Sequence, residues 1–209
     1  SLGIGAIAFN FEPIHNLKGR VDAYKEAIQD PVEQIGQFKN DNVMMTNAVI
    51  CLENRDEARA IAKTKGRGYL VTMVNMYHDT MPKSPDAVTW PDSPIDPNWT
   101  DEMLDWAIGE GYMLCGTPEE VCEQLVRYQD VGCDQVVFGL PIEGMAHEQV
   151  LEMLEIFGQR VIPEFDKDPI HSTDHYRAEA QRKFPDFQYE LPEDISVSVL
   201  PSNALLPLG

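Results

Sequence analysis

The hydrophobic positions of the chain form short continuous runs and stripes of helical period, and the two alternate. The run Leu2–Phe9 (LGIGAIAF) is typical of a strand buried on both faces of a parallel sheet. In the next stretch Val21, Tyr24 and Ile28 share one helix face, and the pattern stops near Pro31. This part of the sequence predicts one strand followed by one helix.

A second strand and helix are predicted from Val43 onward. Val43–Leu52 (VMMTNAVICL) is almost continuously apolar, as a buried strand would be. Asn54 can cap the helix that follows, whose apolar face includes Ala58 and Ile61, and Glu57 stands at the reciprocal capping-box position.

The third unit has the sharpest local signal in the chain. Thr117 suits an N-cap, Pro118 the first helical position and Glu120 the capping box. That helix is expected to end at Gly132, and Asp134–Gly139 predicts a third buried strand.

A last helix is predicted before Pro163, which we expect to end it. Its expected inner face consists of Val150, Leu151, Leu154, Phe157 and Val161. Beyond it, residues 166–209 are rich in Pro, Asp and Ser and predict an extended tail over the surface.

The proline-rich stretch 66–111 departs from this alternation, and only Asp101–Ile108 in it has a helical pattern. It is too long for an ordinary connection, so it predicts a lid or binding loop. An excursion that packs on the outside of the fold explains it equally well.

Strands that alternate with amphipathic helices predict an α/β fold with a parallel sheet and right-handed crossovers. Three strands cannot close a barrel and leave both sheet edges open. A complete (β/α)8 barrel takes about 250 residues. Residues 1–165 therefore predict a partial TIM barrel, the last three strand and helix units. We expect a second copy of the chain to cover the open edges, as a homo-oligomer.

Charge and composition narrow the classes of function. Lys and Arg number 16 against 35 Asp and Glu, a net charge of −19, which disfavours nucleic acid and anionic membranes as partners. Because the sequence has neither a long apolar run nor a signal-peptide core, a cytoplasmic protein is expected. Its four cysteines lack CxxC spacing and predict reduced, mostly buried thiols.

The segment Gly116–Pro141 (GTPEEVCEQLVRYQDVGCDQVVFGLP) resembles the one that precedes and forms the last barrel strand in bacterial luciferase-like monooxygenases. Three further stretches are similar to the same family: Val21–Ala27, Val49–Ala62 and Phe157–Phe165. Their order matches the sixth, seventh and eighth strands of that family, and the resemblance covers residues 2–165.

The resemblance implies a TIM-like barrel in which reduced flavin, FMN or alternatively the deazaflavin F420, oxidises a small organic substrate. Members that use FMN react with O₂, and many receive reduced flavin from a separate reductase. The loop that grips the flavin phosphate in this family would lie before Ser1. The chain alone is therefore expected to be inactive and not to retain FMN. A non-catalytic flavin-binding or structural barrel remnant and an F420-dependent dehydrogenase are the alternatives.

Candidate site residues follow from the rule that barrel enzymes do their chemistry at the carboxyl ends of the strands. Asn10 could hydrogen-bond flavin or substrate, or simply begin a turn. Phe9 and Phe138 could line the flat flavin ring, although core packing is the other role open to Phe138.

Histidines supply the remaining candidates. His78 stands beside Asp79 in the proline-rich stretch and could shuttle a proton if that stretch folds over the barrel mouth, or could be a surface histidine. His171 and His175 have the spacing of a metal pair on a helix, but without a third ligand in view an incidental pair is favoured.

Overall fold

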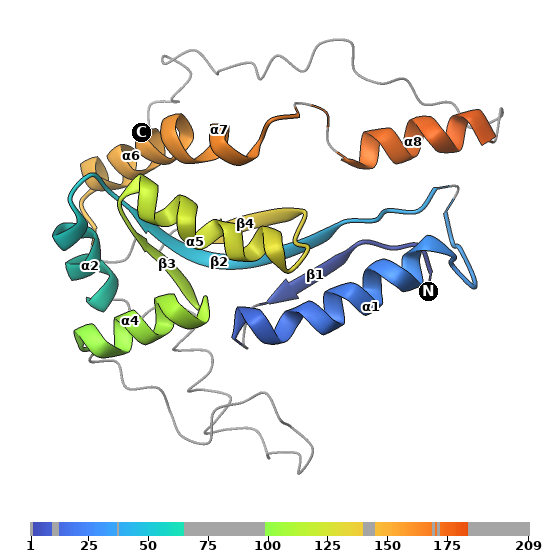
Figure 1. Ribbon diagram of the computed structural model, residues 1–209. Coiled ribbons are helices and arrows are strands. Elements are labelled where there is room, and N and C mark those ends of the chain that lie inside the picture. The colour runs from blue at the N-terminus through green and yellow to red at the C-terminus, as the bar shows by residue number, and fades with distance from the viewer. Residues whose placement is uncertain are drawn as a thin grey trace, which may run out of the picture.

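The computed structural model describes residues 2–9, 13–36, 38–64, 99–139, 145–168, 170 and 172–183, with only the backbone described for Phe9, Ser172 and Thr173. These residues form a parallel sheet with helices around it (Figure 1). The strands are β1 (Ala6–Phe9), β2 (Val43–Cys51), β3 (Met113–Gly116) and β4 (Gln135–Gly139). The helices are η1 (Ile14–Leu17, 3₁₀), α1 (Lys18–Gln29), α2 (Arg55–Lys63), α4 (Asp101–Glu110), α5 (Pro118–Asp130), α6 (His147–Ile156), the π-helical turn η3 (Phe157–Val161), α7 (Ile162–Phe165) and α8 (Ser172–Lys183).

Strand β2 is the centre of the sheet, and each of the other three strands pairs with it in parallel. β1 pairs with Val43–Thr46, and β4 pairs with Met44–Ala48. These stretches overlap, so β1 and β4 must lie at opposite edges of β2. β3 pairs with Ala48–Cys51, the last part of the strand. The predicted α/β class with a parallel sheet is confirmed.

One face of β1, of β4 and of the first part of β2 is buried by the helices, whereas at the end of β2 both faces are buried, with Ile50 and Cys51 each 0% exposed. Alternate residues of β2 face the helices, and among them Met45 and Val49 are 0% and 1% exposed. Met44 precedes Met45, points to the opposite face and is only half-buried. Paired residues of parallel strands point to the same side, so Ile7 and Val137 share Met44's side of the sheet, and they are 63% and 41% exposed. We call this side the uncovered face, formed by Ile7, Met44, Thr46, Ala48 and Val137.

The uncovered face corrects two predictions. The run 2–9 predicted a strand buried on both faces and the run 134–139 a buried strand, but β1 and β4 are each covered on one face only. The apolar runs have the composition of a doubly buried strand, whereas the described residues supply helices for a single side.

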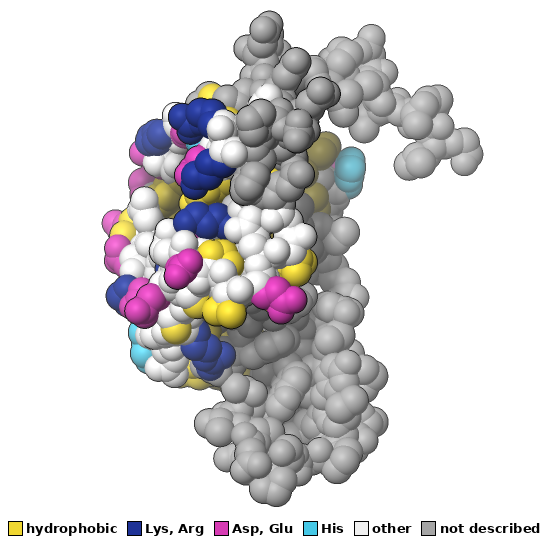
Figure 2. Space-filling view, turned by 90° about the vertical axis from the view of Figure 1, so that its right-hand side faces the viewer, with side chains coloured by type: hydrophobic (Ala, Val, Ile, Leu, Met, Phe, Trp, Pro, Cys, Tyr) yellow, Lys and Arg dark blue, Asp and Glu magenta, His cyan; other side chains and the backbone are white. Residues whose placement is uncertain are grey.

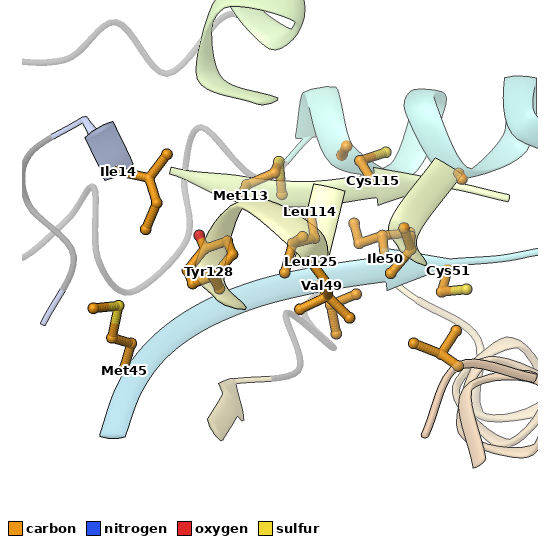
Figure 3. Packing of buried hydrophobic residues seen from close by; sticks show 14 of the residues in the cluster. Ile14, Met45, Val49, Ile50, Cys51, Met113, Leu114, Cys115, Leu125 and Tyr128 are labelled. Atoms are coloured by element: carbon orange, nitrogen blue, oxygen red, sulfur yellow. The ribbon is translucent and has the colours of Figure 1, made fainter. Parts of the chain in front are cut away.

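The core lies between β2 and the helices that cover it. Figure 3 shows Leu125 and Tyr128 of α5 beside Val49 of β2. A buried polar contact ties the same elements together, because the side-chain amide of Asn47 and the hydroxyl of Tyr128 both donate to the carbonyl of Gly111, at 2.9 and 2.5 Å. Asn47 also accepts from the backbone N–H of Ala48 at 2.7 Å. These bonds satisfy polar groups that are costly to bury without partners.

The predicted N-caps of α5 and α2 are confirmed. Thr117 accepts from the N–H of Glu120, and the Glu120 carboxylate accepts from the N–H of Thr117, which closes the capping box. Gly116, just before it, has φ 143°, and a Cβ there would lie 2.3 Å from the Glu120 carboxylate, so the box requires glycine. Asn54 caps α2, but Glu57 accepts from Gln149 at 2.7 Å instead of completing a box.

Strand β3 was not predicted. It begins two residues after Gly111, which ends α4 with φ 79°. The helix itself, Asp101–Glu110, agrees with the expected Asp101–Ile108. All four residues of β3 are buried. A run this short, which directly follows a helix, has no periodicity by which a strand can be recognised.

The last helix corrects two further predictions. Leu151 and Leu154, expected inside, are 52% and 46% exposed, whereas Met153 and Val161 are 1% exposed. Several faces of this helix carry apolar residues, so the period alone could not identify the buried one. Pro163 does not end the helix. The π-helical turn η3 precedes the proline, and α7 continues past it to Phe165.

The tail predicted as extended contains helix α8. Its residues include good helix formers such as Ala178 and Glu179, although it has no continuous apolar stripe, which is why the hydrophobic pattern missed it. Ala180 is buried at 3% exposure, and the Arg177 guanidinium lies 5.4 Å from the Phe38 ring centroid. No helix among the described residues combines the length and the apolar character needed to cross a lipid bilayer.

An ion network holds the amino ends of the strands together. The Lys25 ammonium of α1 lies 2.9 Å from the Asp41 carboxylate and 2.5 Å from that of Asp134. Asp134 also accepts from the N–H of Val43 at 2.7 Å, which joins the starts of β2 and β4. Figure 2 views the molecule from the right-hand side of Figure 1 and shows acidic and basic side chains interspersed there.

Candidate functional site at the carboxyl ends of the strands

The carboxyl ends of the strands all lie at the same end of the sheet, because the strands are parallel. β2 ends at Cys51, β3 at Gly116 and β4 at Gly139, and the first turns of α2 and α5 begin immediately after the first two of these strands. In parallel α/β folds the carboxyl end of the strands carries the chemistry, whereas the amino end mainly stabilises the fold.

Arg160 links three elements at this side. Its guanidinium donates to the carboxylates of Glu53, which follows β2, and Glu119, in the first turn of α5. Hydrogen bonds from its own backbone N–H and from Thr117, with the charge of Arg160, lower the pKa of Glu119. The bond to Glu53 and the two negative charges raise the pKa of Arg160. We call this group the Arg160 bridge.

A second ion pair is formed by residues that are close in the sequence to the two glutamates of the Arg160 bridge. The Arg55 guanidinium at the start of α2 donates to Glu120 at 2.7 Å, the same carboxylate that closes the capping box of α5. Both described arginines that follow the strand ends are therefore occupied by carboxylates.

The thiols at the strand ends are not reactive groups. Burial, with the neighbouring Cys122 and Glu53, raises the pKa of Cys51 to about 12. Burial likewise raises the pKa of Cys115 to about 12. Since the thiolate is the nucleophile, neither side chain is set up for covalent catalysis near neutral pH.

The uncovered face has small residues in the middle of β2, between larger ones. Thr46 and Ala48 lie there, and Gly139, the last residue of β4, pairs with Ala48. Ile50, which follows Ala48 on the same side of β2, is large and 0% exposed. A Cβ added at Gly139 would meet only one atom within 4 Å, a backbone oxygen 3.9 Å away. Ile7 and Met44, which pair with each other two residues before Thr46, are larger. A flat ring could therefore lie against Thr46, Ala48 and Gly139 on this face.

FMN has a ring and a phosphate, and the described residues suit only the ring. A phosphate needs free cations or N–H donors. In the part of the chain that the structure describes, Arg160 and Arg55 are paired with glutamates, and Asn54 and Thr117 cap the helix starts. Glu53 and Glu119 would repel a phosphate. The described strand ends do not fit the phosphate of FMN.

The predicted site residues are not brought together within the described structure. Phe138 points to the helix-covered side, where its ring packs edge-on against Phe157 with centroids 5.0 Å apart. That contact is a core contact. Phe9 ends β1 with only its backbone described, and Asn10 and His78 lie outside the described residues.

The metal pair weighed from the sequence gains no support. His171 lies outside the described residues, and His175 lies 3.4 Å from the carboxylate of Asp168. Across the described ranges, no three histidine, cysteine or acidic side chains gather as metal ligands would.

Arg160 is the residue that sequence reasoning missed. It stands in Phe157–Phe165, a segment noted for family resemblance, but its partners Glu53 and Glu119 are distant in the chain. The small residues Thr46 and Ala48 could have been found, because the alternation along β2 places both on the side opposite Met45.

Comparison with solved structures finds proteins of similar fold. The monooxygenase RslO1 from Streptomyces bottropensis matches with a TM-score of 0.53 at 15% identity, over 78% of this chain and 42% of that protein. Lower scores relate the chain to the F420-dependent tetrahydromethanopterin reductase from Methanopyrus kandleri (0.45; 19% identity; 78% of this chain, 45% of that one). The oxygenating constituent of 3,6-diketocamphane monooxygenase from Pseudomonas putida, solved with FMN, scores 0.44 at 15% identity, over 77% of this chain and 48% of its own.

No protein-family model matches the chain, and no curated protein matches it. The chain spans less than half the length of RslO1. At this identity the likeness concerns the fold alone, and it confirms the expected resemblance to part of a luciferase-like (β/α) barrel.

Proposed function

We propose that the chain forms three strand and helix units of a flavin-dependent oxidoreductase barrel, a monooxygenase that acts on a small organic substrate with reduced flavin and O₂. The uncovered face carries this proposal. β1 and β4 have the composition of strands buried on both faces, yet one face has no cover among the described residues. In a closed barrel that face would be the packed interior.

Within such a barrel we assign this chain one wall of the ring site. Thr46 and Ala48 in the middle of β2 and Gly139 at the end of β4 provide a shallow surface. The phosphate would be held by residues outside the described strand ends, because the Arg160 bridge and the Arg55–Glu120 pair leave no cation for it. Reduced flavin would be delivered by a separate reductase.

A non-catalytic barrel remnant is the second candidate, and the chemistry of the strand ends favours it. The thiols there have pKa values raised to about 12, and Glu53 and Glu119 are held by Arg160. None of these groups is placed to move a proton. A protein of this kind would hold a flavin without turnover.

A binding measurement with two ligands tests the assignment of the ring wall. The purified full chain is titrated into FMN and into riboflavin, which lacks the phosphate, and quenching of flavin fluorescence is followed. We expect weak quenching of both with similar affinity, and no flavin retained on gel filtration. FMN bound more than about tenfold tighter than riboflavin would show a phosphate site and overturn the assignment. Absence of quenching for both would overturn the ring wall.

A pair of matched variants sharpens the same titration. Ala48→Leu fills the small-residue surface and is expected to abolish quenching. Val32→Leu, at a position 91% exposed, makes a comparable addition of bulk elsewhere and should leave quenching unchanged. Equal quenching in both variants would mean that the flavin binds at another place.

A further inference from the structure

A groove beside β4 lies on the helix-covered side of the sheet. It has a volume of about 360 Å³ and is lined by residues of α5, β4, η3 and α7. Phe138 of β4 borders it, and this residue pairs in register with Asn47, which faces the helices. Within the described residues β4 pairs with β2 alone, so the far edge of this strand is open. The groove is therefore separate from the ring wall, which lies on the opposite face of the sheet.

Aromatic side chains form much of the border of this groove. Phe138 and Phe157 pack edge to face, and Phe165 of α7 lines the groove with them. Ile162 and Phe165 are 47% and 36% exposed, so solvent reaches the apolar part of the groove. A ligand that covers these groups would gain burial free energy, and phenyl rings also attract cations.

The charge that lines the groove is negative. Its two charged lining residues are Asp134 and Asp166, and no described Lys, Arg or His is part of the lining. The Lys25 ammonium already occupies Asp134, at 2.5 Å. Asp166 is exposed, and its basic neighbour Lys167 pairs with Glu164 instead, at 3.7 Å. Asp166 is therefore the carboxylate at which a positively charged ligand group would bind.

The volume of the groove suits a small molecule better than a protein segment. One turn of an α-helix with its side chains is about 10 Å across and about 5.4 Å long, which amounts to roughly 400 Å³. The groove holds less than that, whereas pockets for small ligands begin at about 300 Å³. A second copy of the chain would also bring another net charge of −19 to an acidic groove.

We propose that this groove binds a small amphiphilic primary amine, with its apolar part against Phe157 and Phe165 and its ammonium at the carboxylate of Asp166. The aromatic border gives affinity for the apolar part, and the carboxylate distinguishes an amine from an alcohol or an acid of the same shape. The negative charge of the whole chain attracts such a cation from solution.

Three probes of matched shape test the proposal on the full chain: 3-phenylpropylammonium, 3-phenylpropan-1-ol and 3-phenylpropanoate. Binding is followed by the shifts of backbone amide signals in nuclear magnetic resonance spectra. The amine should shift the amides of residues 133–138 and 161–166 and bind about tenfold tighter than the alcohol, and the acid should not bind. Equal binding of amine and alcohol, shifts confined to other residues, or binding of none of the probes would each overturn the proposal.

A pair of carboxylate variants separates the site from the general charge of the chain. Asp166→Asn should weaken the amine about fivefold or more and leave the affinity for the alcohol unchanged. Glu164→Gln removes the same charge from an exposed position outside the groove lining, and it should change the affinity for the amine less than about twofold. Equal effects of the two variants would mean that the amine is attracted by net charge alone.

A pair of apolar variants tests the aromatic border in the same way. Phe165→Ala should weaken amine and alcohol together, whereas Leu154→Ala, at a position 46% exposed and outside the lining, should weaken neither. Groove signals that shift on dilution, together with a falling solution mass, would assign the groove to a second copy and contradict the proposal. Saturating amine should leave the flavin titration unchanged, so failure of the ring wall and failure of the amine site give different results.

Discussion

The two faces of β2 differ in what holds them, although the strand is apolar on both. On the helix side, Met45 and Val49 are fully buried and Asn47 bonds to the carbonyl that ends α4. On the other side, Met44, Thr46 and Ala48 are only partly covered, and burial is complete only at Ile50, near the end of the strand. One face therefore stabilises this chain by itself, and the other has residues suited to an interior that the described residues do not complete. Three predictions test this difference, and a fourth tests the ion network at the amino ends of the strands.

The largest effect is expected from truncating a side chain on the covered face. Met45→Ala removes a fully buried side chain from the core and should lower the free energy of unfolding by about 2–5 kcal/mol, from the lost burial and the remaining cavity. Urea denaturation followed by circular dichroism measures it. Met44→Ala is the matched control and should cost about 1 kcal/mol or less. Equal losses would mean that both faces are packed.

The buried polar contact should have the next largest effect. Asn47→Ala removes the donor to Gly111 and the acceptor for the N–H of Ala48, and a buried group left without a partner costs about 1–3 kcal/mol. Thr46→Ala, the neighbour on the uncovered face, should change the unfolding free energy by less than about 0.5 kcal/mol. A negligible loss in the Asn47 variant would contradict the role given to that contact.

A charge placed on the uncovered face should have little effect on the chain itself. Val137→Lys adds an ammonium where the side chain is already 41% exposed, so the unfolding free energy should stay within about 0.5 kcal/mol of the unmodified value. Thermal and urea unfolding in parallel would detect more. A loss of about 2 kcal/mol or more would show that something covers this face in the isolated chain.

The smallest effect is expected at the amino ends, in alkaline solution. Burial disfavours the charged form of Lys25, but the hydrogen bonds and charges of Asp134 and Asp41 outweigh it and raise the pKa of the ammonium. Its contribution to stability should be complete below the unfolded pKa, about 10.4, and be lost as pH rises through the higher folded pKa. The unfolding free energies of Lys25→Met and of the unmodified chain should differ at pH 8 and converge toward pH 11. Lys18→Met, in an exposed pair, serves as control.

Much of the fold could be predicted from the sequence where local signals were strong. The Thr117 to Glu120 capping box and the apolar run of β2 were recognised because helix caps and buried strands depend on neighbouring residues. β3 and the buried side of α6 were not, because four residues have no period and α6 is apolar on several sides. Helix α8 was missed because its stability does not come from an apolar stripe.

The candidate site was harder to predict than the fold. The Arg160 bridge joins positions 53, 119 and 160, and no pattern in a single sequence reveals a contact across such distances. Phe138 was placed correctly on a strand, but whether its ring faces flavin or core depends on which face the helices cover. Asn10 and His78 lie outside the described residues, so their roles remain predictions.

The π-helical turn at Phe157–Val161 has a consequence for how the last helix tolerates change in length. A π turn holds one residue more than an α turn, so it offsets the angular phase of everything after it by about 100°. Deleting one residue there would convert the turn to regular α-helix and leave α7 in its present orientation, because the π turn absorbs the extra residue. Inserting one more residue without a second π turn would rotate α7 by that angle, so Ile162 and Phe165 would leave their places beside β4, while Met153, before the turn, would keep its place in the core. The turn therefore sets the rotational alignment between the half of the helix that anchors the fold and the half that borders its open edge.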